Sequence, residues 1–349
     1  MMSFIELFKC FLLLKLVQST VGAVIFPIDQ EPNWVMIPTA SGNFVWVHRK
    51  IVEAKTLAKR GLAESDIRFI FYSRTNCTGY VHNLNGLALL SGSVFDSSRP
   101  TRIIIHGWLN NGDSPLNEHL RKAYLYNWDY NVISVDWSAC SSDLNYISAT
   151  ACVRVVGQVV AKMLDYLHEN RELSFRDVYL IGHSLGSHVA GIAGKLVQGG
   201  RIATIVALDP ALPLFSIRKP ENRVAEDDAE YVQVIHTNGG LLGFLEPIGT
   251  ADFYPNGGRS QPGCGWNLLG ICSHARAWQL FLDSLLEADE YLMAEPIASL
   301  DDIQSLGVNR ISRAKLGGEP AAMAYGLYYI YTNAESPYFG FPVVTDDFR

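Results

Sequence analysis

The chain has 349 residues, of which 48% are hydrophobic and 18% charged, so it is able to bury a large core. Its 28 Lys and Arg and 35 Asp and Glu give a net charge of −7, which excludes bulk attraction to nucleic acid or other polyanions. The sequence contains neither Cys-x-x-Cys nor His-Glu-x-x-His, and we expect no metal and no cofactor.

The N-terminal segment is typical of a secretory signal. An apolar stretch begins at Phe11, and Val21-Gly22-Ala23 offers small residues for cleavage. Lys15 interrupts the apolar stretch, which makes it too short and too charged to span a membrane. We therefore predict a signal peptide at residues 1–23, a secreted protein without a transmembrane segment, and one domain at residues 24–349.

Strand-like apolar runs alternate with helical periodicity, which favours βαβ units and a mostly parallel sheet flanked by helices. Apolar residues recur every three or four positions over 153–167, which indicates a helix that packs on the core. A last long helix is expected over about 275–292, and a closing strand over 325–331. The expected strands are 69–72, 103–105, 132–135, 178–181, 205–208 and 231–235.

Five cysteines remain after removal of the signal. Short spacings in an oxidising compartment indicate loop-closing disulfides, and Cys77 is left without an evident partner. Asn76-Cys77-Thr78 fits the glycosylation sequon, although Cys at the middle position makes it a weak acceptor. The natural pairs are Cys140–Cys152 and Cys264–Cys272.

Gly182-His183-Ser184-Leu185-Gly186 is the most informative motif. Gly-x-Ser-x-Gly between a strand and a helix is typical of a nucleophile elbow, a turn so tight that a Cβ at the flanking positions would clash with backbone. The Ser184 hydroxyl then stands exposed at the top of the sheet, and we predict it to be a catalytic nucleophile. His183, inside the turn, is expected to pack beneath it.

A serine hydroxyl needs a base and an orienting acid, which on such a fold follow in the order acid, then histidine. The first acid at a strand end after Ser184 is Asp209, directly behind residues 204–208. Its alternative role is that of a helix cap or turn-former. The rival acids are Asp227 and Asp228, in a charged run taken to be solvated, and Asp252.

Two histidines compete for the role of base. His236 ends a predicted strand and has an alternative role as a satisfied residue at the rim of the sheet. His274 starts a helix on the loop side of the sheet, within reach of the serine, and is the predicted base. The oxyanion needs two backbone donors, for which we expect the amide of Leu185 and that of Trp108 in the loop after 103–105.

Several short strings of this sequence resemble the animal pancreatic-type lipases, including the secreted phospholipases A1, and the resemblance covers nearly all of the mature chain. The resemblance implies an α/β-hydrolase fold, a triad of Ser184, Asp209 and His274, and oxyanion donors at Trp108 and Leu185. The matching strings are 105–108, 135–137, 182–195, 208–211, 234–237, 252–258 and 272–274.

Three departures from the family pattern bear on substrate. Cys264 and Cys272 close a lid loop of only seven residues, and the loop 238–251 is also short, as in the phospholipase A1 members. The chain stops soon after Phe341-Pro342, so we expect neither the β-sandwich domain nor colipase binding. Ala225 interrupts the calcium pattern at 223–228, so we expect no bound calcium.

The short loop is apolar, with Trp266, Leu268, Leu269 and Ile271. Such side chains beside a catalytic serine are able to insert into a lipid surface, or alternatively to fold onto the protein. We expect a secreted serine ester hydrolase acting at a lipid–water interface, most specifically a phospholipase A1. The alternatives are a triacylglycerol lipase or galactolipase of the same family, or a non-catalytic yolk-like lipid-binding protein.

Overall fold

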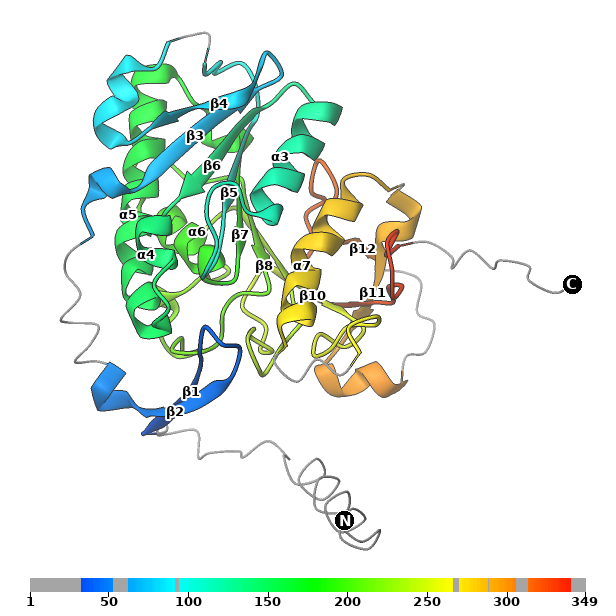
Figure 1. The fold of residues 1–349 in the computed structure, drawn as a ribbon. Coiled ribbons are helices and arrows are strands. Elements are labelled where there is room, and N and C mark those ends of the chain that lie inside the picture. Colours follow the sequence, from blue (N-terminus) through cyan, green and yellow to red (C-terminus); the bar gives the residue numbers. More distant parts are fainter. Residues whose placement is uncertain are drawn as a thin grey trace, which may run out of the picture.

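The computed structural model describes residues 33–52, 62–91, 94–265, 270–287, 289–305 and 313–339. The predicted signal peptide, residues 1–23, lies outside the described residues. Within them, eleven strands form one sheet in the order β12-β11-β13-β10-β9-β8-β7-β5-β6-β3-β4, and β1 and β2 form a separate hairpin (Figure 1).

The seven central strands, from β6 to β13, run parallel to one another. Antiparallel strands extend the sheet at both edges. Strands β3 and then β4 follow β6 at one edge, and β11 and then β12 follow β13 at the other. The bounds are β3 Arg68–Ser73, β4 Asn76–His82, β5 Thr101–Ile105, β6 Asn131–Asp136, β7 Val178–His183, β8 Thr204–Leu208, β9 Tyr231–Ile235, β10 Ala251–Pro255, β11 Met293–Ile297, β12 Ala314–Lys315 and β13 Gly326–Ile330.

Helices cover both faces of the sheet, which explains why strands β5 to β10 are buried along their whole length. Ile103 and Ile105 of β5 share a core cluster with α5 (Tyr146–Arg171) and α6 (Leu185–Leu196). Ile104 points to the other face, where it shares a cluster with α3 (Pro115–Asn127) and α7 (Ile271–Ser284). The layers are visible in Figure 1, and together with the mostly parallel sheet they make this an α/β-hydrolase fold.

The chain order of the central strands creates a switch point between β5 and β7. From β5 the chain passes through α3 to β6 on one side, and then returns through α4 (Ser138–Ser141) and α5 to β7 on the other. The loops that leave the carboxyl ends of β5 and β7 therefore diverge, and ligands of open α/β sheets bind in the crevice between such loops.

Helix α5 is long and apolar enough to cross a membrane by length and composition. It serves here as a core helix, because 61% of its most apolar window is buried inside the protein. The apolar face predicted from the sequence is buried in the core. It includes Val153, Val156, Val160 and Leu164.

All six predicted strands are present, with bounds extended by up to two residues. The last helix was predicted too long, since α7 ends at Ser284 and Asp289–Leu292 forms a 3-10 turn instead. A distant segment contacts this end of the helix, since the Ser284 hydroxyl accepts a hydrogen bond from the Gly318 amide at 3.0 Å. The predicted closing strand is β13, but it lies inside the sheet, because the unpredicted strand β11 pairs on its outer side.

The hairpin of β1 (Trp34–Pro38) and β2 (Phe44–His48) was also not predicted. Val35 and Val47, a directly opposed pair, pack against the core. The hairpin lies at the lower end of the main sheet in the view of Figure 1. The hairpin thereby comes to lie beside the switch point, although it is far from those loops in the sequence.

Candidate active site

Ser184 occupies a strained turn between β7 and α6, as the Gly-x-Ser-x-Gly motif predicts. Its φ of 57° and ψ of −123° are a conformation that non-glycine residues rarely adopt and that often marks functional sites. A Cβ on Gly182 would overlap the carbonyl of Gly186, and one on Gly186 would overlap the carbonyl of Ile105. The motif therefore needs both glycines for close backbone contact.

Asp209 and His274 form a hydrogen bond of 2.5 Å between Oδ2 and Nδ1. Asp209 is fully buried directly after β8, and its other oxygen accepts bonds from the amides of Thr237 and Asn238 at 2.7 and 2.9 Å. The carboxylate is thus fixed on both sides, and it holds the imidazole of His274 by one nitrogen. The second nitrogen of His274 is left for contact with a reacting group.

Ser184 and His274 line one cavity of about 390 Å³. Its walls come from the loop after β5, the start of α3, the start of α7 and the turn of the β1–β2 hairpin. The side chains that line it are mainly apolar, among them Phe44, Trp108, Leu109, Leu116, Leu242, Ile271 and Trp278. The cavity therefore suits a long apolar group attached to a polar reacting centre.

The two predicted oxyanion donors flank Ser184. Leu185 is the first residue of α6, where backbone N–H groups have no partner within the helix. Trp108 lines the cavity, and its ring is fixed by a 2.7 Å bond from Nε1 to the Asp143 carbonyl. A Cβ on Gly107 would lie 2.9 Å from the Cβ of Ser184, so only glycine lets the loop approach this closely.

His183 lies beside the predicted base, in addition to packing within the elbow. Its Nε2 is 3.0 Å from the carbonyl oxygen of His274, and the two rings are 4.6 Å apart between centroids. Burial and the neighbouring His274 lower the pKa of His183 to about 3, so the ring is neutral and donates to this carbonyl. His183 thereby supports the first turn of α7, a role that the elbow motif alone did not indicate.

Two of the rival residues pair with each other. The Nε2 atom of His236 is 2.8 Å from Oδ1 of Asp252, both side chains are buried, and neither lines the cavity of Ser184. The alternative reading of His236 as a satisfied residue at the end of β9 is therefore the observed one.

Asp228 was wrongly placed in a solvated run, because it is buried in an ion pair with Lys195 and accepts a 2.8 Å bond from the Ala225 amide. Burial raises the pKa of Asp228 to about 6. Its neighbour Asp227 is exposed, as expected. Within the described residues, no group of three or more His, Cys, Asp or Glu is arranged to hold a metal ion.

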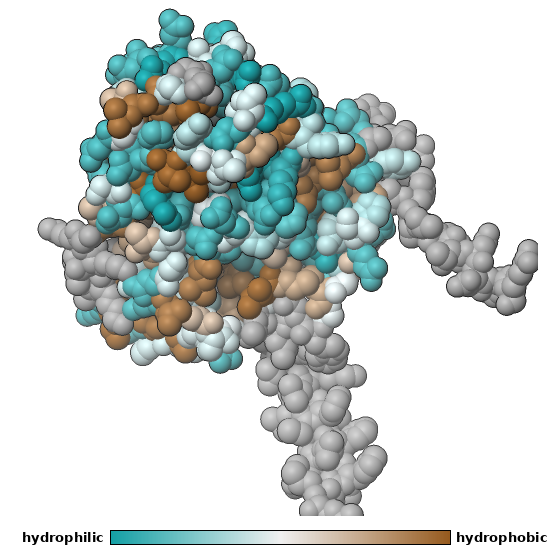
Figure 2. All heavy atoms as spheres, turned by 45° about the horizontal axis from the view of Figure 1, so that its top comes forward, coloured by the Kyte–Doolittle hydropathy of each residue, from teal (hydrophilic) through white to brown (hydrophobic). Residues whose placement is uncertain are grey.

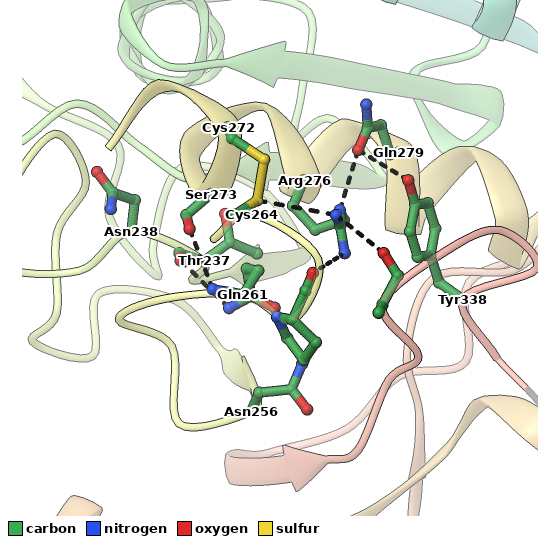
Figure 3. Close-up of a disulfide and its surroundings, with 12 residues drawn as sticks. Thr237, Asn238, Asn256, Gln261, Cys264, Cys272, Ser273, Arg276, Gln279 and Tyr338 are labelled. Carbon is green, nitrogen blue, oxygen red and sulfur yellow. Dashed lines mark hydrogen bonds between the residues drawn. A yellow bond between two sulfur atoms is a disulfide. The ribbon is translucent and has the colours of Figure 1, made fainter. Parts of the chain in front are cut away.

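Both predicted disulfides are present, Cys140–Cys152 and Cys264–Cys272, and Cys77 is exposed as a free thiol. Figure 3 shows the second bridge at the start of α7. Arg276 of this helix donates to the Pro262 carbonyl at 2.9 Å and stacks on Tyr338. The predicted lid residues Trp266, Leu268 and Leu269 lie outside the described residues.

The base of the disulfide loop is linked to the segment that holds Asp209. Gln261 donates from its backbone to the Ser273 hydroxyl and from its side chain to the Thr237 carbonyl, at 3.0 and 3.2 Å (Figure 3). Ser273 precedes His274, and the Thr237 amide binds Asp209. One connected set of contacts thus links Gln261 in the disulfide loop to Asp209 and His274.

A larger hollow of about 1060 Å³ lies at the other end of the strands, lined by residues that precede β7, β8 and β9. Because α/β sheets bind ligands at the carboxyl ends of their strands, the smaller cavity at Ser184 is the candidate active site.

Comparison with known proteins identifies the family. The model of the Lipase family matches residues 34–338. The chain belongs to the lipase family. This lipase-family chain is 35% identical to the hepatic triacylglycerol lipase of Homo sapiens over 79% of its own length and 61% of that protein. It is 36% identical to the pancreatic triacylglycerol lipase of Mus musculus, over 64% and 52% of the two chains.

A further lipase-family relative is the phospholipase A1 of Vespula vulgaris, 41% identical over 52% of this chain and 56% of that protein. The chain thus spans between half and two thirds of the length of these three relatives. The resemblance seen in the sequence motifs is confirmed at the level of the family.

Proposed function

We propose that this protein is a secreted serine ester hydrolase that acts on acyl-lipids and releases the sn-1 fatty acid of phospholipids. The observation that carries the proposal is the 2.5 Å bond between His274 and Asp209 at the edge of the cavity that Ser184 lines. A nucleophile, a base and an orienting acid at one cavity are the parts that acyl transfer from an ester requires.

In the proposed reaction, the Ser184 hydroxyl attacks the ester carbonyl while His274 accepts its proton. Asp209 orients the ring and stabilises the imidazolium that forms. The amides of Trp108 and Leu185 bind the oxyanion. His274 then gives its proton to the leaving alcohol, and an acyl-enzyme remains on Ser184. A water molecule, activated by the same histidine, hydrolyses this ester and releases the fatty acid.

The apolar cavity walls support an acyl-lipid as substrate. Two observations favour a phospholipid: the similarity to the Vespula vulgaris phospholipase A1 and the seven-residue loop between Cys264 and Cys272. A short loop leaves a more open cleft for a polar head group. Two disulfides and the signal-like N-terminus support a secreted protein.

The test is a positional assay on phosphatidylcholine that carries different fatty acids at sn-1 and sn-2. We expect the purified protein to release the sn-1 acid and Ser184→Ala to release none. Release of the sn-2 acid, or activity on triacylglycerol alone, would contradict the phospholipase A1 proposal while leaving the ester hydrolase proposal in place.

A triacylglycerol lipase or galactolipase is the second candidate, and the similarity to hepatic and pancreatic triacylglycerol lipases favours the first of these. Parallel assays on triolein and a galactolipid separate the candidates. A non-catalytic lipid-binding protein is distinguished by a fluorophosphonate probe, which we expect to label Ser184. Absence of labelling in folded protein would favour the non-catalytic alternative.

A further inference from the structure

The turn of the β1–β2 hairpin forms part of the wall of the Ser184 cavity. Pro38, at the end of β1, and Phe44, at the start of β2, both line it. The hairpin precedes the main sheet in the sequence and contributes no strand to it. The hairpin is therefore a separate element whose turn adds a wall to the cavity.

The register of the hairpin places an apolar stripe on the face that reaches the cavity. Directly opposed residues share a face, and alternate residues along each strand share it too. Val35 and Val47 face the core. The stripe on the opposite face consists of the pairs Pro38–Phe44, Met36–Trp46 and Trp34–His48. It starts at the cavity wall and runs outward along the hairpin.

The outer part of this stripe is exposed. Trp46 is 68% and Trp34 is 54% exposed, although tryptophan is usually well covered in folded proteins. Leu109 and Ile271 also line the cavity and are 42% and 57% exposed. Figure 2 shows hydrophobic side chains on the lower part of the visible face, and a further group at its upper left. Exposed apolar side chains next to one cavity mark an interaction surface.

The charge of the hairpin is opposite to that of the whole chain. Residues 33–50 contain no Asp or Glu, and the exposed Lys50 lies just after β2. The chain as a whole has a net charge of −7. A positive end beside an aromatic stripe matches a phospholipid surface, where anionic phosphates lie above the acyl chains.

We propose that the outer face of the hairpin, with Trp34, Met36 and Trp46, joins Leu109 and Ile271 in a surface that binds a phospholipid bilayer or micelle. This surface places the cavity mouth on the lipid, so that an acyl chain enters along apolar side chains without crossing water. The inference rests on the proposed function for its purpose, whereas binding itself is measurable without hydrolysis.

The binding test uses Ser184→Ala protein and sedimentation with phosphatidylcholine vesicles that contain phosphatidylserine. Trp46→Asp places a charge in the stripe, and we expect it to lower vesicle binding by about tenfold because a charge at a lipid interface is unfavourable. Trp46→Phe is expected to retain most of the binding. The matched control is Tyr126→Asp, at an 85% exposed aromatic residue that does not line the cavity.

Hydrolysis by protein with Ser184 intact provides the second readout. We expect Trp46→Asp to lower the rate on vesicles roughly tenfold more than the rate on a short-chain soluble ester, because only the former requires interfacial binding. Equal losses on both substrates would overturn the proposed surface. Unchanged vesicle binding of Trp46→Asp would overturn it too, and a change in oligomeric state in that variant would then indicate a contact between copies of the chain. Absence of all ester hydrolysis in the unmodified protein would contradict the proposed function alone, since sedimentation still tests the surface.

Discussion

His236 and Asp252 form a buried pair, with 2.8 Å between Nε2 and Oδ1. The other ring nitrogen of His236 lies 2.7 Å from the Phe244 carbonyl, and Asp252 also accepts a bond from the Ile248 amide at 2.9 Å. The pair immobilises the end of β9, directly before Thr237, whose amide binds Asp209. It therefore acts on the candidate site through the backbone.

Removal of the carboxylate in Asp252→Ala should leave His236 and the Ile248 amide without their buried partner. We expect a loss of roughly 1–3 kcal/mol in the free energy of unfolding, measured in urea, because buried donors lose their acceptor. The control is Asp227→Ala, which removes an exposed carboxylate of the same size. Equal stability of the two variants would show that the buried pair contributes nothing.

Asp209→Asn is expected to lower kcat on a soluble ester by roughly ten-thousand-fold, as loss of the orienting acid does in other triads. The asparagine oxygen is expected to keep the two amide bonds from Thr237 and Asn238, which turns its NH2 group toward Nδ1 of His274. The ring is then held in the tautomer that cannot accept the proton of Ser184. Thermal unfolding monitors the fold, and a variant with nearly full activity would contradict the assignment of Asp209.

Ser184→Ala should lower kcat by about a hundred-thousand-fold or more while the fold is retained, since the nucleophile is lost. The rate of a soluble ester and the melting temperature are measured together. Ser187→Ala is the control. Ser187 is a second serine, one turn further along α6, and its hydroxyl donates to the Gly182 carbonyl and is not expected to attack a substrate. Similar losses of activity in both variants would argue against Ser184 as the nucleophile.

The two disulfides should differ in their effect on activity. Replacing either pair by serine removes a short loop closure and is expected to cost about 2–3 kcal/mol of stability. Cys264–Cys272 lies next to His274, whereas Cys140–Cys152 ties α4 to α5. We therefore expect removal of Cys264–Cys272, but not removal of Cys140–Cys152, to lower kcat at temperatures well below unfolding. Equal losses of kcat would contradict a positioning role for the loop.

Acid should destabilise the protein through His188. Its Nε2 lies 2.7 Å from the Ala211 carbonyl, and burial lowers its pKa to about 3 from the ordinary value of 6.5. The unfolded chain binds a proton more readily, so this stability is complete above pH 6.5 and is lost as the pH falls toward 3. Unfolding free energies measured across this range should fall less steeply in His188→Asn. The exposed His119→Asn is the control, and identical slopes for His188→Asn and the unmodified protein would contradict the prediction.

Much of the candidate site was predictable because its signals are local. Gly182 reports a close backbone contact with Gly186 inside the five-residue motif, and Asp209 follows an apolar run directly. The short cysteine spacings identified both disulfides. The contact between His183 and the carbonyl of His274 joins residues 91 positions apart, and no local pattern reports such a distance.

By itself the sequence determined the alternation of strands and helices, the strained turn at Ser184 and the order of the candidate acid and base, since periodicity, glycine spacing and chain order act over short stretches. The tertiary structure alone decided that His236 pairs with Asp252, that β13 lies inside the sheet, and that the β1–β2 hairpin lines the cavity. These outcomes depend on which distant surfaces become buried together, because a carboxylate or an apolar face is satisfied only by the partner that the packed fold brings to it.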